Sequence, residues 1–416
     1  MSLDHNNDNT HSLDVYRDRF QWPRQDNGER TTYLCGNSLG LQPIAAAERV
    51  AEVLKDWAEL GVEGHFNAER SWLNYHAQAT PLLAGLLHCE DDEVVAMNTL
   101  TVNLNLLMLS FYRPTPERFK ILIEEDAFPS DQYAVQSQLS LQGIDPKDNI
   151  VIWRRNNGVY NPDDLANLLA SDSEIAMMLI PGVQYLTGEW LDLTRIAALA
   201  REYDVTLGLD LAHAVGNVPI DLNAIDADFA AFCTYKYLNS GPGAIAGAWV
   251  NRRHHGSDVP RLHGWWGNDE SNRFEMRSTF SPAPGTEVWQ QSNPPILALA
   301  PVVASLEMFD AVGMPALREK STVLTGTLRA RIQEELGDHI DVLTPSETSR
   351  YGAQLSLALR TSASDGRQVF NHLQQQGVIG DWREPNVIRV APAPLYNNLD
   401  DVNRLVDVLH AAIRAL

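Results

Sequence analysis

Two residues in the middle of the chain, Asp210 and Lys236, are of types that could act together in catalysis. Asp210 closes an apolar alternating run, VTLGLD, and Lys236 follows a second apolar run, FAAFCTY, just before a glycine-rich turn. The stretch between them has room for one crossover, so both side chains would stand at the carboxyl ends of neighbouring strands. Such a pair suits a pyridoxal 5′-phosphate site, because the lysine holds the cofactor covalently and the carboxylate keeps the pyridine nitrogen protonated.

Each residue of this pair also has a purely structural explanation. An aspartate after a strand is often a helix cap or a turn former, and a lysine is usually solvated on the surface. Lys236, however, lies within apolar and aromatic sequence, where an unpaired ammonium group would be costly. The setting of the pair favours a cofactor site, and the structural explanations remain open at this point.

Three further segments carry groups that such a site would use. In NTLTVN a helix start follows a strand and offers the Thr101 hydroxyl to a phosphate, although Thr101 could equally serve as a simple N-cap. In FPSD, Phe128 could stack on a ring with the Asp131 carboxylate beside it. Arg389 lies inside an apolar strand, where a substrate carboxylate or an internal salt bridge would explain it equally well.

Several other kinds of site are excluded by spacing. The run GPGAIAG has the spacing G-x-G-x-x-x-G and precedes a predicted strand, whereas a dinucleotide loop precedes a helix. The chain has no Walker motif, no H-E-x-x-H and no paired C-x-x-C. His254 and His255 are adjacent in a basic loop and are interpreted as solvated, so no metal site is predicted.

Alternating strands and helices must position these groups. This alternation predicts an α/β fold with a mainly parallel sheet that helices cover on both faces. A long helical pattern covers 296–336, after a loop at 260–295 that is rich in Trp, Gly, Pro and Asn. The last part of the chain alternates strand and helix as a smaller α+β unit. The predicted strands of the large sheet are 94–97, 120–124, 150–154, 175–180, 205–211, 228–234 and 246–251.

Composition and length limit the class of protein. The 416 residues suit two domains, with an N-terminal arm at 1–42, a large domain at 43–300 and a small domain at 301–416, which the arm is expected to join. A formal charge of −22 disfavours nucleic acid and anionic membranes as partners.

No apolar run approaches the roughly 20 residues that cross a bilayer. Residues 1–12 are polar, which predicts a disordered tail and no secretory signal. The three unpatterned cysteines fit a reducing cytoplasm.

Long segments of the chain resemble the kynureninase family, fold-type I pyridoxal phosphate enzymes of the class V aminotransferase-like group. The resemblance covers nearly the whole sequence and implies a fold-type I large domain with a mainly parallel sheet, followed by a smaller α+β domain. Several of the segments are not shared with the wider superfamily. The matching segments are GNSLGLQP, MNTLTVNLNLLMLSFY, AFPSDQYA, GVQYLTG, DLAHAVGN, TYKYLNSGPGAIAGA, GWWGN, SNPPIL and IRVAPAPLYN.

The resemblance also implies roles for individual residues. Lys236 matches the lysine that holds the cofactor, Asp210 the partner of the pyridine nitrogen, and Arg389 the residue that binds the substrate α-carboxylate. In the family, a Trp and an Asn near the phosphate come from the neighbouring subunit of a homodimer. One departure is Pro181, which stands where some members have a hydroxyl residue. The remaining implied cofactor contacts are Leu100, Thr101, Phe128, Pro129, Ser130, Asp131, His213, Tyr235, Trp265 and Asn293, and the implied substrate contacts at the aromatic end are His65, Ser292 and Asn293.

The implied reaction is hydrolysis of the Cβ–Cγ bond of L-kynurenine or 3-hydroxy-L-kynurenine to L-alanine and anthranilate or 3-hydroxyanthranilate, in tryptophan breakdown or NAD biosynthesis. His65 with Ser292 and Asn293 favours the hydroxylated substrate by resemblance. Tyr235 is the candidate acid/base, which requires an irregular backbone, since neighbours along a strand point to opposite faces. The rival functions are a cysteine desulfurase-like lyase, which needs a nucleophilic cysteine on a mobile loop, a transaminase, and a non-catalytic scaffold.

Overall fold

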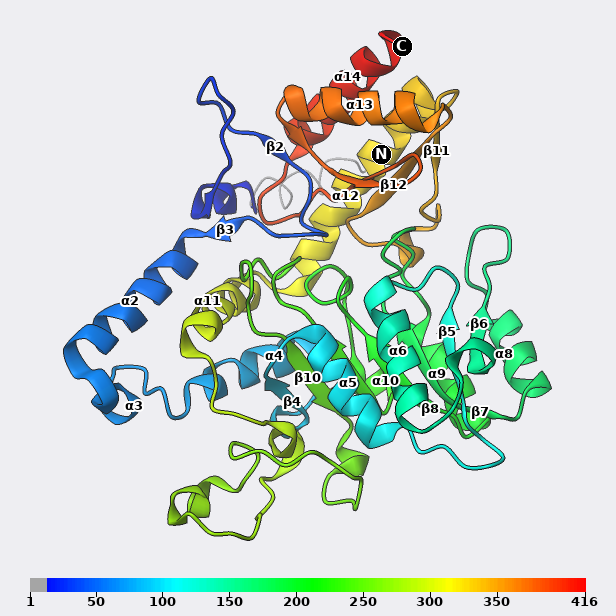
Figure 1. Ribbon diagram of the computed structural model, residues 1–416. Helices are drawn as coiled ribbons and strands as arrows, with labels where there is room; N and C mark the ends of the chain where they lie inside the picture. Colours follow the sequence, from blue (N-terminus) through cyan, green and yellow to red (C-terminus); the bar gives the residue numbers. More distant parts are fainter. Residues whose placement is uncertain (1–12) are drawn as a thin grey trace, which may run out of the picture.

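The computed structural model describes residues 13–416, in a large part built on one sheet and a smaller part above it (Figure 1). The tail predicted at residues 1–12 lies outside the described residues. Short 3₁₀ turns punctuate the described chain. They are η1 (Leu13–Arg19), η2 (Gly61–Glu63), η3 (Tyr75–Gln78), η4 (Asp91–Glu93), η5 (Arg252–His254), η6 (Glu270–Glu275), η7 (Gly285–Trp289) and η8 (Thr348–Arg350).

The large part is organised by a seven-stranded sheet in the order β4-β10-β9-β8-β7-β5-β6. Strands β9, β8, β7, β5 and β6 run parallel, and β10 is antiparallel to both of its neighbours. The predicted mainly parallel α/β fold is therefore confirmed. The strands are β4 (Val94–Ala96), β5 (Lys120–Glu124), β6 (Ile150–Trp153), β7 (Ile175–Pro181), β8 (Thr206–Asp210), β9 (Phe229–Phe232) and β10 (Gly247–Val250).

Helices cover both faces of this sheet because its strands are apolar on both sides. Helices α5 (Leu100–Phe111) and α6 (Pro129–Leu141) lie side by side on one face, where Leu107 and Val135 pack with Ile123 (Figure 1). Apolar side chains on the opposite face of the sheet form a second cluster with another set of helices. Those helices are α4 (Thr80–Leu87), α8 (Pro162–Ser171), α9 (Leu193–Glu202), α10 (Leu222–Ile225) and α11 (Ile296–Val312). The other helices of the large part are α2 (Ile44–Leu60), α3 (Gly64–Asn67) and α7 (Pro146–Asn149).

The smaller part has a four-stranded antiparallel sheet in the order β11-β12-β15-β14 with its own apolar core. The N-terminal arm joins it, since β2 (Thr32–Tyr33) pairs with β13 (Val378–Ile379) and the Ala391 N–H donates to Leu34 O. Its other elements are β11 (Ile340–Val342), β12 (Leu355–Leu359), β14 (Asp381–Arg383), β15 (Val387–Val390), α12 (Met314–Leu336), α13 (Ala363–Gln375) and α14 (Leu399–Arg414), and the arm also forms β1 (Phe20–Gln21) with β3 (Gln42–Pro43).

The single long helix expected over 296–336 is wrong. Helices α11 and α12 meet at Gly313, which has φ 79° and ψ 142°, and their axes are bent by 83°. Glycine adopts this conformation without a steric penalty, so the chain can turn sharply there. Helix α11 packs with the core of the large part, whereas Leu324 of α12 packs with the core of the small part. This packing favours a domain boundary later than residue 300. The division at 42 and 300 stays a prediction.

Among residues 13–416, no single helix has the length and hydropathy to cross a bilayer. The bent pair α11 and α12 has both only when the two helices are taken together.

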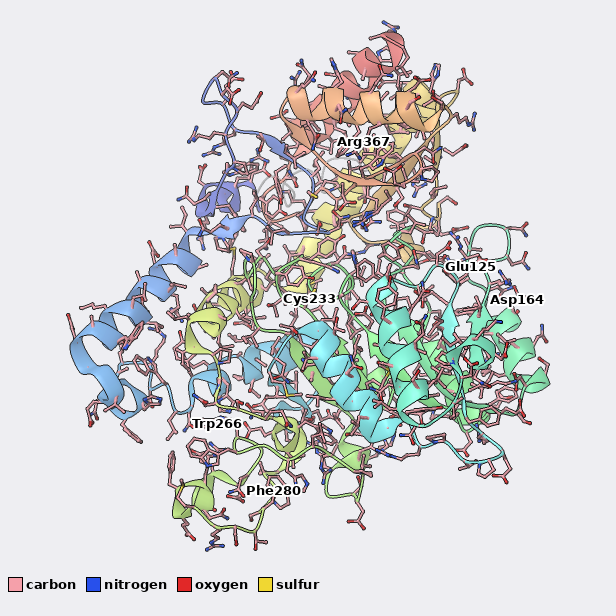
Figure 2. The ribbon with its side chains drawn as sticks, viewed as in Figure 1. Glu125, Asp164, Cys233, Trp266, Phe280 and Arg367 are labelled. Carbon is pink, nitrogen blue, oxygen red and sulfur yellow. The ribbon has the colours of Figure 1, made fainter. Side chains whose placement is uncertain are left out.

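The loop between β10 and α11 is ordered by its own side chains (Figure 2). Trp266 is buried, and Arg273 lies over its ring at 4.3 Å while donating to the carbonyl oxygens of Trp266 and Asn268. The tip of this loop nevertheless exposes apolar side chains, among them Trp265 and Phe274. An exposed apolar group on an ordered loop favours contact with another surface.

The bend at Gly313 generates a stability prediction with a matched control. Gly313→Ala should lower the free energy of unfolding by about 1–3 kcal/mol, because a side chain strains this positive-φ backbone. Gly326→Ala, within α12 where an added Cβ meets no atom within 4 Å, should raise it by about 0.5–1 kcal/mol. Urea denaturation of both variants tests this, and equal effects would contradict the assigned role of Gly313.

Candidate functional site

A cavity of about 260 Å³ lies at the carboxyl ends of the parallel strands, below the smaller sheet. Ligands of open α/β sheets bind at this edge. The cavity brings together ten of the residues singled out from the sequence, from segments far apart in the chain. They are Leu100, Thr101, Phe128, Ser130, Asp131, Asp210, His213, Tyr235, Lys236 and Arg389.

Lys236 is presented by a turn rather than by a strand. Strand β9 ends at Phe232, and the backbone then bends through Asn239, which has φ 56°. The Gly40 N–H donates to Tyr235 O at 2.9 Å, and the Thr234 hydroxyl donates to Ile245 O at 2.6 Å. Both Tyr235 and Lys236 line the cavity, so the backbone irregularity required for Tyr235 is present.

The amine of Lys236 has a histidine as its nearest polar neighbour. Its Nζ lies 3.0 Å from Nε2 of His213, which follows β8. Burial first, and then the charges of Lys236, Arg389 and Arg383, hold the pKa of His213 well below its usual value. The imidazole is therefore neutral, and its buried Nδ1 has no hydrogen-bond partner.

Three buried carboxyl groups form the acidic side of the cavity. Asp210 accepts a hydrogen bond from the Ala212 N–H at 2.8 Å. Burial and the neighbouring Asp210 raise the pKa of Asp131 well above its usual value, and its Oδ1 has no hydrogen-bond partner. Burial, with smaller contributions from Asp210 and Asp126, raises the pKa of Glu124 to about 8. Glu124 was not singled out from the sequence, although an acidic residue closing the apolar run KILI was a usable signal.

Two helices begin at the edge of the cavity. Helix α5 starts at Leu100 and α6 at Pro129, and the hydroxyl oxygens of Thr101 and Ser130 lie 2.7 Å apart between them. Free backbone N–H groups at helix starts, together with hydroxyls, form a favourable environment for a phosphate. Pro129 is exposed and does not line the cavity, so it acts only through the position of its helix.

Arg389 has the internal salt bridge that was one of the two explanations offered for it, and its contact with a substrate carboxylate stays a prediction. Its Nε lies 3.1 Å and its Nη2 2.8 Å from the oxygens of Asp381, and Arg389 also lines the cavity. Tyr185, which was not singled out, receives a hydrogen bond from Arg389 Nη1 at its carbonyl oxygen. The Tyr185 ring meets Phe128 edge to face at 5.1 Å, which fixes the aromatic wall of the cavity.

Four residues singled out by resemblance are not brought to the cavity by this chain. His65 lies on α3, with its Nδ1 3.0 Å from Val62 O. The other three lie on the loop between β10 and α11. All four are partly or fully exposed, with Trp265 at 47%. They are His65, Trp265, Ser292 and Asn293.

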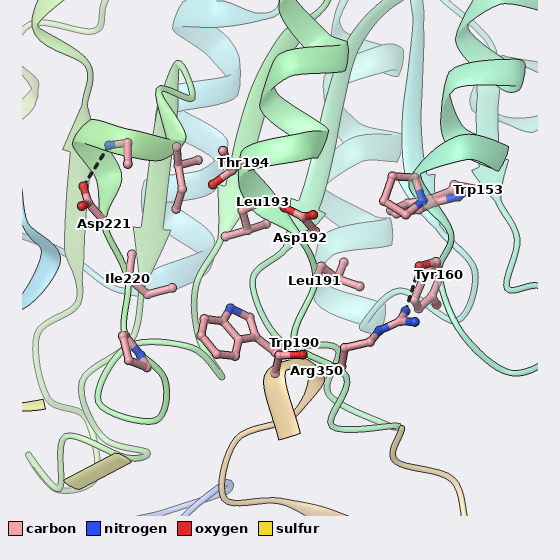
Figure 3. A pocket seen from close by; sticks show the side chains of 15 residues that line it. Trp153, Tyr160, Trp190, Leu191, Asp192, Leu193, Thr194, Ile220, Asp221 and Arg350 are labelled. Carbon is pink, nitrogen blue, oxygen red and sulfur yellow. Dashed lines mark hydrogen bonds between the residues drawn. The ribbon is translucent and has the colours of Figure 1, made fainter. Parts of the chain in front are cut away.

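A second cavity, of about 540 Å³, is lined by a different set of residues (Figure 3). Trp190 and Leu191 line it, together with Asp192 and Asp221, but none of the residues singled out from the sequence does. Asp192 caps α9 by accepting from the Arg195 N–H, and Asp221 caps α10. These carboxylates are therefore engaged in capping, and the cavity gathers no reactive group.

Known proteins resemble this chain over almost its full length. A family model described as the kynureninase C-terminal domain matches residues 317–409. A kynureninase of Xanthomonas oryzae pv. oryzae is 50% identical over 95% of this chain and 94% of its own, and a kynureninase of Xanthomonas campestris pv. campestris is similar to the same extent. The chain belongs to the kynureninase family. The resemblance stated from the sequence is thereby confirmed.

Solved structures that share the kynureninase family's fold are more distant in sequence. A mutant of the cystine C–S lyase C-DES, which carries glycine covalently linked to its PLP cofactor, has a TM-score of 0.80 at 18% identity over 91% of this chain and 96% of its own. A cysteine desulfurase of Escherichia coli has a TM-score of 0.77 at 18% identity, over 97% of this chain and 99% of its own. These similarities support the fold alone.

The buried carboxyl of Glu124 leads to a prediction about pH and stability. In the folded protein its pKa is near 8, whereas the unfolded chain releases the proton near 4.5. Between these values the folded state binds more protons, so Glu124 lowers stability as pH rises. Glu124→Gln should therefore gain about 1–3 kcal/mol over the wild type between pH 5 and pH 8. Urea denaturation across this range measures the gain.

The neighbouring Glu125 supplies the control. Burial would raise the pKa of Glu125, but hydrogen bonds from Arg155 and Arg154 outweigh it and lower the pKa. Its stabilising effect is then complete above about pH 5, so Glu125→Gln should lose the same stability at every pH from 5 to 8. A Glu124→Gln difference that is also constant over this range would contradict the assigned state of Glu124.

Proposed function

We propose that this protein is a pyridoxal phosphate-dependent hydrolase that cleaves the Cβ–Cγ bond of L-kynurenine or 3-hydroxy-L-kynurenine. The products are L-alanine and anthranilate or 3-hydroxyanthranilate, in tryptophan catabolism or NAD biosynthesis. The observation that carries the proposal is the common cavity of Lys236, Asp210 and Arg389, in a chain 50% identical to kynureninases. These three groups meet the cofactor's aldehyde, the cofactor's ring nitrogen and the substrate's carboxylate, respectively.

The residues of the cavity fit this cofactor. Two buried polar atoms, Asp131 Oδ1 and His213 Nδ1, have no hydrogen-bond partner among residues 13–416, and both residues line the cavity. Thr101 and Ser130 place hydroxyls where two helices begin, which suits the phosphate. When bound, pyridoxal phosphate supplies a cationic ring that takes up electrons from bonds at the substrate's α-carbon.

Charge placement assigns the acid and base roles. Asp210, oriented by the Ala212 N–H, holds the proton of the ring nitrogen as its carboxylate. Lys236, beside the neutral His213, moves the proton at the substrate's Cα. Burial, together with the neighbouring Cys233 and Asp210, raises the pKa of Tyr235, so its hydroxyl keeps a proton to donate during cleavage.

A homodimer would complete the site. Four residues that do not reach the cavity are partly or fully exposed, and Trp57 and Leu297, close in sequence to His65 and Asn293, are exposed apolar side chains. The four are His65, Trp265, Ser292 and Asn293. A two-fold axis would allow the loop of one subunit to close the cavity of the other. We propose this assembly in the cytoplasm, with no nucleic acid or membrane as partner, and with the predicted arm, large domain and small domain as its parts.

The desulfurase-like alternative lacks its nucleophile. Among residues 13–416 no cysteine lines the cavity. Burial is the main cause that raises the pKa of Cys35 to about 12 and the pKa values of Cys89 and Cys233 above the ordinary range. Cys233 is buried near the middle of the view in Figure 2, on the segment of the chain that leads to Lys236. Since the thiolate is the nucleophile, these thiols are unreactive.

Replacement of Lys236 tests the proposal directly. Lys236→Ala should lose the visible absorbance of covalently held pyridoxal phosphate and lower kcat for kynurenine hydrolysis by about 10²- to 10⁴-fold or more, since the proton carrier is lost. Lys147→Ala, which removes an exposed lysine, serves as the control. Full activity of Lys236→Ala, or turnover of cysteine instead of kynurenine by the wild type, would contradict the proposal.

The shared site predicts complementation between inactive variants. In a mixed dimer of Lys236→Ala and Asn293→Ala, one of the two cavities receives both native residues. Equal mixing after unfolding and refolding should restore about a quarter of the wild-type activity, because half of the dimers are mixed and each has one intact site. If each subunit used its own Asn293, mixing would restore nothing.

A further inference from the structure

Two arginines share one carboxylate on the small-domain wall of the cavity. Asp381 on β14 lies opposite Arg389 on β15, and Arg383 is two residues further along β14, on the same face as Asp381. Arg383 Nη2 donates to Asp381 Oδ2 at 3.1 Å, and Arg389 contacts both oxygens. Both arginines line the cavity that contains Lys236.

This arrangement leaves one positive charge without a partner. Arg389 is 1% exposed and Asp381 11%, so solvent screens them poorly, whereas Arg383 is 34% exposed. Two guanidinium groups against one carboxylate give an excess of one positive charge, which solvent reaches only from the side of Arg383. A carboxylate entering the cavity would balance this excess.

The two arginines differ in how many of their N–H groups are already engaged within the protein. In Arg389, Nε and Nη2 contact Asp381 and Nη1 donates to Tyr185 O at 2.6 Å, so few of its five N–H groups remain. Arg383 is less engaged, since its buried Nε lies 2.9 Å from Asp381 Oδ1 without forming a hydrogen bond. Arg383 therefore has more donors available than Arg389.

The opposite side of the cavity carries carboxyl groups instead of arginines. Glu124, Asp131 and Asp210 gather there, away from the two arginines on the small domain's β14 and β15. An amino acid with a free carboxylate would thus enter with that group toward the arginines. Electrostatic complementarity of this kind determines orientation more than overall affinity.

We propose that Arg383 is a second specificity-determining residue that binds the substrate's α-carboxylate together with Arg389. Asp381 acts as a positioning residue that holds the two guanidinium groups side by side. The inference rests on the proposed function, since the carboxylate is that of the kynurenine substrate. It extends substrate recognition from one arginine to a pair that spans two strands.

The test separates carboxylate recognition from general damage. In the holoenzyme, Arg383→Met should raise KM for L-kynurenine by about 10- to 100-fold, the effect of losing a hydrogen bond to a charged group. Its affinity for kynuramine, the analogue that lacks the α-carboxylate, should stay within about two-fold of the wild type by calorimetry, because the lost contact involves only that group. Arg383→Lys, which keeps the charge without the planar fork, should lie between the two.

Arg360→Met is the matched control, because Arg360 pairs with Asp341 in the same domain but does not line the cavity. It should leave both values unchanged. An unchanged KM in Arg383→Met, or an equal loss of affinity for both ligands, would overturn the inference. If the wild type left kynurenine intact, the proposed function would fail, and calorimetry with kynurenine itself would still measure what Arg383 contributes.

Discussion

The hydrogen bond from the Gly40 N–H to Tyr235 O anchors the turn on which the cavity depends. A Cβ on Gly40 would lie 2.1 Å from Asn239 Oδ1 and 2.5 Å from Lys236 O, so only glycine allows this approach. The arm thereby supports the turn from behind while Lys236 and Tyr235 face the cavity. A rigid backbone at this point gives Lys236 a defined position. The proposed function requires this, because the amine must reach both the cofactor's aldehyde and the proton at the substrate's Cα.

Charge is distributed unevenly within the cavity, against the background of an acidic protein. The formal charge of −22 repels anions at long range, yet the small-domain wall carries two arginines and the opposite side three carboxyl groups. Burial raises the pKa values of Glu124 and Asp131, so much of the acidic side is uncharged at neutral pH. Local placement rather than net charge therefore controls which ligand binds and in which direction.

Much of the large domain could be predicted because its strands are short, apolar and separated by helices; β5 at Lys120–Glu124 matches its prediction residue for residue. The break at Gly313 was missed, since apolar residues continue on both sides of it. Glu124 was missed although its place at the end of an apolar run was a usable signal. Arg383 could not be recognised as a cavity residue from local sequence, because its neighbours in space come from distant segments. The antiparallel direction of β10 could not be predicted either, because the alternation of strands and helices does not distinguish parallel from antiparallel pairing.

The pairing of β2 with β13, and of Leu34 with Ala391, has a consequence for the order of folding. The segment that supports the Lys236 turn is separated from the strands that hold it by most of the large domain. Contacts between such distant segments are slow to form, because a long loop must close first. The Lys236 turn would therefore gain its support late in folding, after the small sheet has formed.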